Sequence, residues 1–463
     1  MNYDLIVIGS GPGGYVAAIR AAQLGMKVAV VEKAELGGIC LNWGCIPTKS
    51  LLKSAQVLEY VRNASDYGII NGGEARPDFS AVVKRSRDVA AGMSKGVQFL
   101  FKKNSIEHLK GTGKLSGSGR VEVAGDDGAL TTHTAPHIIV ATGARSKELP
   151  GLKQDGVKII GYREAMTLPS QPGSILVVGS GAIGSEFAWF YQTMGTEVTL
   201  VEFLPRIVPN EDEEVSKQLE RSFKKAKMKI HTSASVESAV VRGDKVEALI
   251  KTSKGTETGL YDIVLSAAGV VPNTEGIGLE ESGVRLEKGK VMVDDFYRTS
   301  LPGVYAIGDI VHGPALAHVA SAEGIICVEK IAGLDVKPLD YKNIPACTYT
   351  VPEIASVGLT EEKAKQEGYE VKTGKFPFTA SGKASSAGAK EGFVKLIFDA
   401  RYGELLGAHM IGANVTEMIA EIVVARRLEI TGHDIIKSVH PHPTMSEAIM
   451  EAAAAAYGEV IHL

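Results

Sequence analysis

Near its start the chain has an apolar run followed at once by a glycine-rich turn. Residues 5–14 read Leu-Ile-Val-Ile-Gly-Ser-Gly-Pro-Gly-Gly, and a second apolar run, residues 28–31, ends at the acid Glu32. Glycines at the spacing G-x-G-x-x-G allow a tight turn and a close approach of the backbone to a pyrophosphate, while the acid accepts hydrogen bonds from ribose hydroxyls. Residues 5–32 therefore predict a dinucleotide-binding βαβ unit.

The same unit recurs 170 residues further along. Residues 175–184 read Ile-Leu-Val-Val-Gly-Ser-Gly-Ala-Ile-Gly, and Glu202 occupies the place of Glu32. One such pattern would be weak evidence, but two copies with the acid at the same distance predict two dinucleotide sites. The acid argues against a 2′ phosphate, so we expect NAD at the second site, although nearby Arg206 leaves NADP open. The predicted site residues are Gly9, Gly11, Gly14 and Glu32 for the first site, and Gly179, Gly181, Gly184 and Glu202 for the second.

Two cysteines follow the first unit closely. Residues 37–49 read Gly-Gly-Ile-Cys-Leu-Asn-Trp-Gly-Cys-Ile-Pro-Thr-Lys. A regular helix would separate the alpha carbons of Cys40 and Cys45 by ~7.5 Å, beyond the ~7 Å that a disulfide spans. A bond between them therefore requires a distorted turn. Gly44 could supply this turn, and Pro47 suits the first turn of a helix that follows it. Such a strained bond would be easy to reduce, which predicts a redox pair beside a flavin, with FAD at the first site. Two buried thiols or half of a metal site are the alternatives.

Composition narrows the class of protein. The chain has 463 residues, 44% of them hydrophobic and 22% charged, and a net charge of -4, which is typical of a globular protein with room for about three domains and lacks the basic character of nucleic-acid binding. We expect no secretory signal, no membrane span and a cytoplasmic location, because the first residues run directly into a strand and no apolar run is long enough. Cys327 and Cys347 are expected to be buried thiols.

Further elements follow from the apolar pattern. Asp309 closes an apolar run and could be a turn residue, and a helix is expected to start near residues 315–317. Residues 381–388 are expected to form a loop. The other predictions are strands at 137–140, 262–266, 302–309, 351–355, 392–398 and 405–409, the last three antiparallel, and helices from Val415 and Met445.

Residues 440–447 read His-Pro-His-Pro-Thr-Met-Ser-Glu, at the start of the last predicted helix. A dithiol substrate needs a base near neutral pH, which suits His442, and Glu447 could orient it. Glu447 could equally complete a capping box with Thr444, and His442 could be an ordinary packed loop histidine.

Together these motifs, with Ala141-Thr142-Gly143, Ala306-Ile307-Gly308-Asp309 and Leu316-Ala317-His318, resemble those of the pyridine nucleotide-disulfide oxidoreductases over essentially the whole chain. The resemblance implies an α/β fold with two Rossmann-like dinucleotide-binding domains and a C-terminal α+β dimerisation domain. The implied domains are 1–146 for FAD, 147–272 for NAD, 273–344 as a central domain completing the FAD site, and 345–463 as the interface domain.

The resemblance also implies an activity, the oxidation of protein-bound dihydrolipoamide to lipoamide with NAD+ as acceptor. Cys45 would contact the flavin, and Cys40 would exchange with the substrate. In an implied homodimer, His442 and Glu447 would complete the site of the other subunit, with a cis bond between His442 and Pro443. Further implied FAD contacts are Lys49, Gly113, Thr142, Gly143, Asp309 and Ala317. The implied NAD contacts are Glu186, Val236 and Gly269, and Glu186 would pair with Lys49.

One departure concerns residues 269–273, Gly-Val-Val-Pro-Asn, where relatives have Gly-Arg-x-Pro-Asn. The missing arginine leaves the strength of NAD binding open. The implied partners are a lipoylated acyltransferase or an H protein, with neither nucleic acid nor membrane. The rival functions are a reductase of glutathione-like or mercuric substrates and a non-catalytic FAD-containing scaffold.

Overall fold

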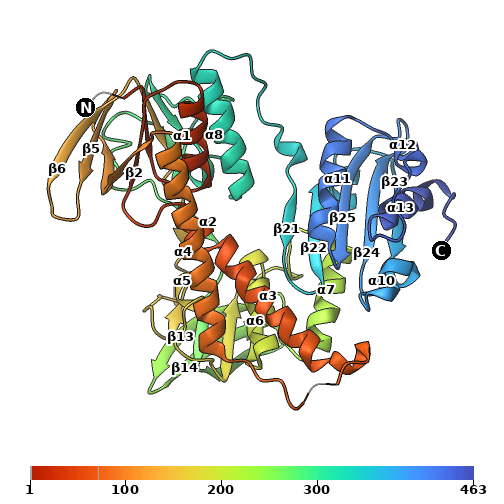
Figure 1. Ribbon diagram of the computed structural model, residues 1–463. Coiled ribbons are helices and arrows are strands. Elements are labelled where there is room, and N and C mark those ends of the chain that lie inside the picture. Colours follow the sequence, from red (N-terminus) through yellow and green to blue (C-terminus); the bar gives the residue numbers. More distant parts are fainter. Residues whose placement is uncertain (1–2, 71) are drawn as a thin grey trace. The chain divides into compact units, whose positions relative to one another are not determined.

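The computed structural model describes residues 3–70 and 72–463 (Figure 1), so the expected domain start at Met1 lies outside the described residues. The described residues group into two compact units. The first contains residues up to Leu51, Ser80–Lys147 and Val270–Asp340, and the second contains Leu52–Phe79, Glu148–Gly269 and Tyr341–Leu463.

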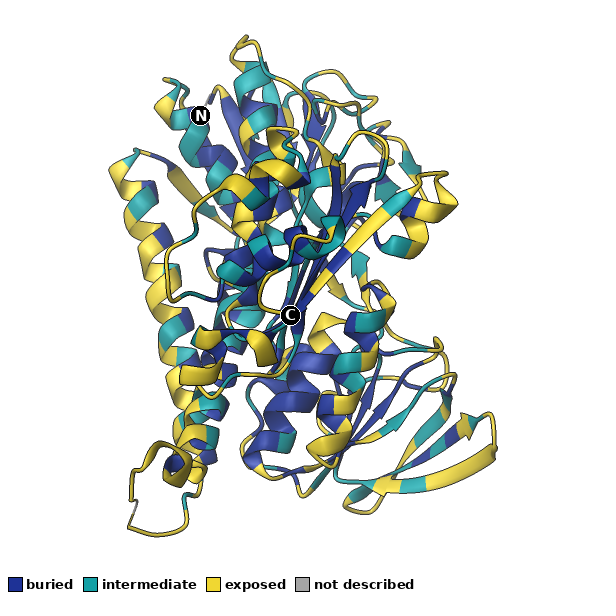
Figure 2. Cartoon of the chain, turned by 90° about the vertical axis from the view of Figure 1, so that its right-hand side faces the viewer, coloured by how far each residue is buried: buried dark blue, intermediate teal, exposed yellow. Residues whose placement is uncertain are grey.

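A five-stranded parallel sheet organises the first unit, in the order β20-β7-β1-β2-β3. The central strands are apolar and almost fully buried, as expected for strands covered on both faces (Figure 2). Helices α1 and α8 pack together against this sheet, and Gly13 and Gly324 let their backbones approach closely. The strands are β1 (Leu5–Ile8), β2 (Val28–Glu32), β3 (Glu107–Lys110), β7 (His137–Val140) and β20 (Val304–Ala306), and the helices are α1 (Pro12–Gln23) and α8 (Ala317–Ile331).

Smaller elements complete the first unit. An antiparallel sheet, β4-β5-β6, precedes β7, and two-stranded ribbons form from β8 with β17 and from β18 with β19. The cysteine stretch forms α2 and the start of α3, and α4 follows. These elements are α2 (Gly38–Trp43), α3 (Cys45–Arg62), α4 (Phe79–Lys103), β4 (Thr112–Leu115), β5 (Arg120–Ala124), β6 (Leu130–Thr134), β8 (Ala144–Ser146), β17 (Val270–Pro272), β18 (Leu286–Glu287), β19 (Lys290–Val291) and η2 (Gly308–Ile310). The part of α3 from Leu52 onward and η1 (Ala64–Tyr67) belong to the second unit.

The second unit repeats the parallel sheet, in the order β12-β11-β10-β16-β9, followed by an antiparallel sheet, β13-β14-β15. The predicted repeat of the βαβ unit is therefore confirmed. Its elements are β9 (Ile159–Ile160), α5 (Tyr162–Ala165), β10 (Ser174–Val178), α6 (Ala182–Met194), β11 (Glu197–Val201), α7 (Glu213–Lys225), β12 (Lys229–His231), β13 (Ser235–Arg242), β14 (Lys245–Thr252), β15 (Gly255–Tyr261) and β16 (Ile263–Ser266).

The C-terminal part of this unit is an antiparallel sheet, β21-β22-β25-β24-β23. Helices α11 and α13 share one apolar core with it. The elements are η3 (Tyr341–Asn343), β21 (Ala346–Thr348), β22 (Glu353–Gly358), α9 (Glu361–Gln366), β23 (Val371–Pro377), η4 (Phe378–Ala380), α10 (Gly382–Ser386), β24 (Phe393–Asp399), β25 (Leu405–Gly412), α11 (Val415–Arg427), α12 (Gly432–Lys437) and α13 (Glu447–Tyr457).

Two sequence predictions need correction. Residues 381–388 are not simply a loop: Gly382–Ser386 form α10, because the Ser381 side chain caps the helix by accepting a hydrogen bond from the N–H of Ala384. Cys327 is buried as predicted, but Cys347 is only half-buried, because it lies on the sheet's outermost strand, β21. Within the described residues, no helix is both long and apolar enough to span a bilayer.

Candidate redox and dinucleotide sites

The first unit gathers the predicted FAD residues at one edge of its parallel sheet. Gly9 follows β1, Glu32 ends β2, Thr142 follows β7 and Asp309 follows β20. These four strands are neighbours and all point the same way, so their carboxyl ends lie side by side. The edge outside the carboxyl ends of parallel strands is where open α/β sheets bind ligands.

The three glycines of the first turn have different roles. Gly9 has φ +102°, and a Cβ there would lie 2.3 Å from the carbonyl oxygen of Ala141. A Cβ on Gly14 would lie 2.0 Å from the carbonyl oxygen of Gly9. At Gly11, the N-cap of α1, a Cβ would meet nothing within 4 Å, and no side chain caps the helix. The outer glycines therefore close the turn, and the middle one leaves bare N–H groups beside open space, which fits a pyrophosphate.

The acid Glu32 is held by Ser10, a residue that the sequence reasoning missed. Glu32 Oε2 accepts hydrogen bonds from Ser10 N at 2.9 Å and Ser10 Oγ at 2.8 Å, and Oε1 accepts one from Ala34 N at 2.9 Å. Oε1 keeps a further lone pair for a ribose hydroxyl. The serine was hidden because it stands at a variable position of the glycine pattern.

Asn273 holds the turn after β7. Thr142 Oγ1 donates to the Asn273 carbonyl at 2.7 Å, Asn273 Nδ2 donates to the Thr142 carbonyl at 3.0 Å, and Asn273 N donates to the Gly143 carbonyl at 2.8 Å. Gly143 has φ +67° and open space around its missing Cβ. The predicted contact residues Thr142 and Gly143 are therefore fixed by a residue 131 positions away.

The remaining predicted FAD residues have differing surroundings. Burial raises the pKa of the Asp309 carboxyl, which Lys290 partly offsets. Ala317 is the first residue of α8. Gly113 lies in β4, where a Cβ would meet Ile8 and Val31 at 3.0 and 3.1 Å, so this glycine is needed for packing against the sheet.

The second unit reproduces this geometry around the predicted NAD residues. A Cβ on Gly179 would lie 2.6 Å from the Ala267 carbonyl oxygen and one on Gly184 would lie 1.9 Å from that of Gly179, whereas Gly181 is open and caps α6 without a side-chain bond. Glu202 is buried, and it accepts from Ser180 N at 2.9 Å, from Ser180 Oγ at 2.6 Å and from Leu204 N at 2.8 Å.

Three other predicted NAD residues are less closely grouped. Glu186 is buried in α6 and accepts a hydrogen bond from Tyr349 N at 3.0 Å. Gly269 follows β16 with φ +103° and open space, and Val236 pairs with Ile250 in the antiparallel sheet. Val270 and Val271, which stand where an arginine was expected, lie in β17, and this strand pairs with β8 within the first unit.

The redox cysteines are brought together at a break between two helices. Helix α2 ends at Trp43, Gly44 is its C-cap, and α3 begins at Cys45, with Pro47 in its first turn, so the predicted distortion at Gly44 is confirmed. The thiols of Cys40 and Cys45 share a hydrogen bond. That bond and burial raise the pKa of Cys40, while the nearby charge of Lys49, one helical turn after Cys45, acts in the opposite direction. In the described part of the chain, no three His, Cys, Asp or Glu side chains gather as metal ligands would.

Helix α4 supports this break with three consecutive residues that the sequence reasoning also missed. Arg85 Nη1 donates to the Ser50 carbonyl at 3.0 Å, Ser86 Oγ donates to the Pro47 carbonyl at 2.9 Å, and Arg87 Nη2 donates to the Asn42 carbonyl at 2.5 Å. Arg87 also lies over the Trp43 ring, 4.2 Å from its centroid. These contacts fix both sides of Gly44, and only the fold could reveal them.

His442 and Glu447 form a pair at the start of α13. His442 Nδ1 lies 2.9 Å from Glu447 Oε1, while Glu447 Oε2 accepts a hydrogen bond from Thr444 N at 2.8 Å. Both interpretations of Glu447 therefore apply, since half of the capping box coexists with the histidine pair. Burial opposes ionisation of Glu447, but the bonds from Thr444 and His442 lower its pKa overall. The expected cis bond between His442 and Pro443 is present.

Comparisons with known proteins agree with this architecture. The family described as pyridine nucleotide-disulphide oxidoreductase matches residues 3–324, and its dimerisation domain matches residues 344–453. The chain is 50% identical to a dihydrolipoyl dehydrogenase of Zymomonas mobilis, across 100% of this chain and 99% of the relative. It is 48% identical to a dihydrolipoyl dehydrogenase of Rhizobium etli, with the same coverage.

A solved structure is similar as well. The crystal structure of LpdA from Mycobacterium tuberculosis covers 97% of this chain and 98% of its own, with a TM-score of 0.90 and 30% identity. The motifs, the duplicated dinucleotide turns and these similarities agree over the full length. The chain belongs to the pyridine nucleotide-disulphide oxidoreductase family.

Proposed function

We propose that this chain is a dihydrolipoyl dehydrogenase, which oxidises protein-bound dihydrolipoamide to lipoamide with NAD+ as acceptor. The observation that carries the proposal is the hydrogen-bonded pair Cys40 and Cys45, in the same unit as a dinucleotide-binding turn. The two relatives named above, about half identical over the full length, supply the substrate class. Both relatives are named dihydrolipoyl dehydrogenase, which argues against a reductase of glutathione-like or mercuric substrates.

The two dinucleotide sites would hold FAD in the first unit and NAD in the second. Gly11 and Gly181 fit a pyrophosphate, because each combines a bare helix N-terminus with open space. FAD, when bound, supplies a two-electron link between thiols and nicotinamide. The proposed FAD contacts are Gly9, Gly11, Gly14, Glu32, Lys49, Gly113, Thr142, Gly143, Asp309 and Ala317, and the proposed NAD contacts are Gly179, Gly181, Gly184, Glu186, Glu202, Val236 and Gly269.

The thiol chemistry belongs to Cys40, Cys45 and His442. His442 takes a proton from the substrate dithiol, and the resulting thiolate attacks Cys40 Sγ of the oxidised pair, which breaks the Cys40–Cys45 bond and releases the Cys45 thiolate. The second substrate sulfur then attacks the first, closing lipoamide and releasing Cys40. Glu447 orients the imidazole through Nδ1, which leaves Nε2 to act on the substrate, and Lys49 favours thiolate over thiol.

The second active-site element comes from another copy of this chain. The His442 side chain is 77% exposed, which suits a base that meets its substrate only when a partner covers it. Apolar side chains are exposed nearby on the segment matched to the dimerisation domain, namely Val424, Leu428 and Val439. We therefore assign residues 345–463 as the interface domain of a homodimer, after the FAD, NAD and central domains at 1–146, 147–272 and 273–344.

The lipoyl group would arrive on a lipoylated acyltransferase or an H protein of a multienzyme complex. Such a partner carries the dithiol on a flexible arm, so only the lipoyl group, and not the whole partner, has to enter the active site. A pair that cycles between thiols and a disulfide suits a reducing compartment, and we place the protein in the cytoplasm on that ground.

The test replaces Cys40 by Ser. Cys40→Ser should abolish NADH formation from dihydrolipoamide, because the exchange sulfur is gone, while the yellow flavin absorbance of the purified protein stays. Cys347→Ser is the matched control and should keep wild-type turnover. Turnover of dihydrolipoamide by Cys40→Ser would refute the assignment, and wild-type activity with only glutathione disulfide or mercuric ion would favour the rival reductase.

A further inference from the structure

The His-Pro-His-Pro segment holds a second histidine whose environment differs from that of His442. His440 Nε2 lies 2.8 Å from Glu421 Oε1, and His440 Nδ1 lies 3.0 Å from the Ser438 carbonyl oxygen. A carbonyl and an ionised carboxylate only accept hydrogen bonds, so the contacts at both ring nitrogens favour the doubly protonated, cationic form of His440. The hydrogen bond to Glu421 is also the largest cause of a raised pKa of His440.

His440 is enclosed, whereas His442 is open. The side chain of His440 is 7% exposed against 77% for His442. Among the described residues, His442 has a hydrogen bond at Nδ1, to Glu447, and none at Nε2. The segment therefore contains one histidine held as a cation and one with a nitrogen left for chemistry.

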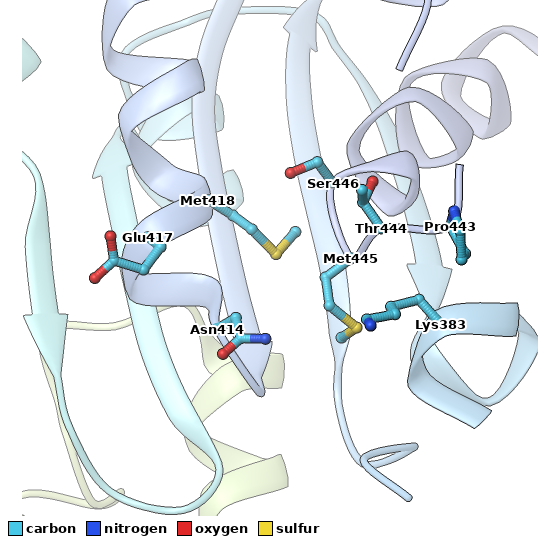
Figure 3. A pocket seen from close by; sticks show the side chains of 8 residues that line it. All are labelled: Lys383, Asn414, Glu417, Met418, Pro443, Thr444, Met445 and Ser446. Carbon is cyan, nitrogen blue, oxygen red and sulfur yellow. The ribbon is translucent and has the colours of Figure 1, made fainter. Parts of the chain in front are cut away.

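The contact of His440 with α11 lies on the same helix as the lining of an open surface pocket. A pocket of about 410 Å³ lies between residues 443–446 and α11 (Figure 3), lined by Glu417 and Met418 of the helix and by its N-cap Asn414, with Lys383 at its side. Glu421 is one helical turn beyond Glu417 on α11. The His440–Glu421 pair thus fixes the segment to α11 next to this pocket.

The charges around His440 connect it to the catalytic pair. Glu421 faces it from α11, and Glu447 contributes an attraction from the start of α13. Reciprocally, the charge of His440 is one cause that lowers the pKa of Glu447. The two histidines and two carboxylates form one chain of alternating charge, Glu421, His440, Glu447 and His442.

We propose that His440 is a positioning residue that acts as a fixed cation: bound to Glu421, it anchors residues 438–446 and keeps Glu447 ionised, so that His442 stays oriented as a base. The proposal rests on the proposed function. Without the cation, Glu447 is protonated more easily, and a protonated Glu447 holds the His442 ring less firmly, so dithiol oxidation should weaken most at low pH.

The experiment measures the pH dependence of kcat/KM for dihydrolipoamide in His440→Gln and His440→Lys. For His440→Gln we expect an acid limb moved to higher pH by about half a unit, which lowers kcat/KM on that limb by about threefold. His440→Lys keeps a positive charge within reach of Glu421 and should restore most of the activity. Reduction of a dye by NADH bypasses the dithiol step and should stay at the wild-type rate in both variants.

Two further variants complete the design. Glu421→Gln should reproduce the His440→Gln profile, and it carries the test if His440→Gln fails to fold; His433→Gln, on the neighbouring helix α12, should match the wild type. An unchanged profile in His440→Gln, or equal losses in His440→Gln and His440→Lys, would overturn the role of the cation. If the wild type oxidises no dihydrolipoamide at all, the proposed function fails instead.

Discussion

Ser10 and Ser180 occupy the same place in the two dinucleotide turns. Each gives its N–H and its hydroxyl to the acid 22 residues later, Glu32 or Glu202. The acid predicted to bind ribose is thus held in place before any ligand arrives, which lowers the entropy cost of binding. Ser180 Oγ also accepts a hydrogen bond from Val208 N at 3.2 Å, so it ties the segment after Glu202 to the turn.

Ser180→Ala should therefore weaken NAD+ binding without disturbing FAD. Loss of one hydrogen bond to a buried charged carboxylate costs about 1–2 kcal/mol, which corresponds to a KM for NAD+ raised about tenfold. The measurement is steady-state kinetics at saturating dihydrolipoamide, with flavin content read from the visible spectrum.

Ser10→Ala provides the matched comparison, because it makes the same change in the other turn. It should leave the KM for NAD+ unaltered and increase the loss of FAD during dialysis. A raised KM for NAD+ in Ser10→Ala, or none in Ser180→Ala, would mean that the two turns are assigned to the wrong nucleotides.

Strands and helices meet in the second unit along a row of polar side chains. Ser356, His409, Lys395 and Lys375 are register partners across β22, β25, β24 and β23. Opposite them, the acids at the start of α7 approach the buried Lys395, with Asp212 at 3.2 Å and Glu214 at 3.0 Å. Glu361 completes the cluster at 2.8 Å. Ion pairs thereby join the start of α7 to the C-terminal sheet.

Glu211, unlike the acids around Lys395, is buried without an ion pair to any described residue. Burial raises its pKa to about 7, and its Oε2 has no hydrogen-bond partner among the described atoms. Between about pH 4.5 and 7, the unfolded state releases this proton while the folded state keeps it, so the folded state loses stability as pH rises. Glu211→Gln should raise the melting temperature at pH 8 and leave it unchanged near pH 4.5. The gain at pH 8 is at most about 3 kcal/mol.

Calorimetry at the two pH values checks this, with Glu213→Gln as the control, an exposed residue at the start of α7 two positions further along. The control should move the melting temperature little, since its carboxylate is paired with Lys217 in solvent. An equal gain for Glu211→Gln at both pH values would show that packing, rather than ionisation, limits stability there.

The sequence was sufficient for elements whose pattern is local. The two glycine turns, the parallel strands and the break at Gly44 all follow from neighbours in the chain, whereas the cis bond after His442 was expected only from the family resemblance. It was insufficient where a partner is distant: Arg87 reaches Asn42 across 45 residues, and Asn273 reaches Thr142 across 131. Helix α10 was missed because its sequence is rich in Gly and Ser, and a single cap at Ser381 decides it.

The proposed dimer places the two halves of each active site on different chains. Cys40 and Cys45 belong to the first unit, whereas His442 and Glu447 belong to the second. A two-fold dimer has identical interfaces on both chains, so each of its two sites would take one cysteine pair and the partner's histidine. Two inactive variants can then complement each other.

Co-expression of Cys40→Ser and His442→Gln chains with different tags, followed by purification through both tags, gives a heterodimer with one intact site. That site takes its cysteines from the His442→Gln chain and its histidine from the Cys40→Ser chain, so we expect about half of the wild-type turnover per dimer. Each variant purified alone should be nearly inactive and should retain flavin. Sites contained within one chain would leave both halves of the heterodimer defective, and an inactive, flavin-bound heterodimer would therefore show that His442 serves its own chain or none.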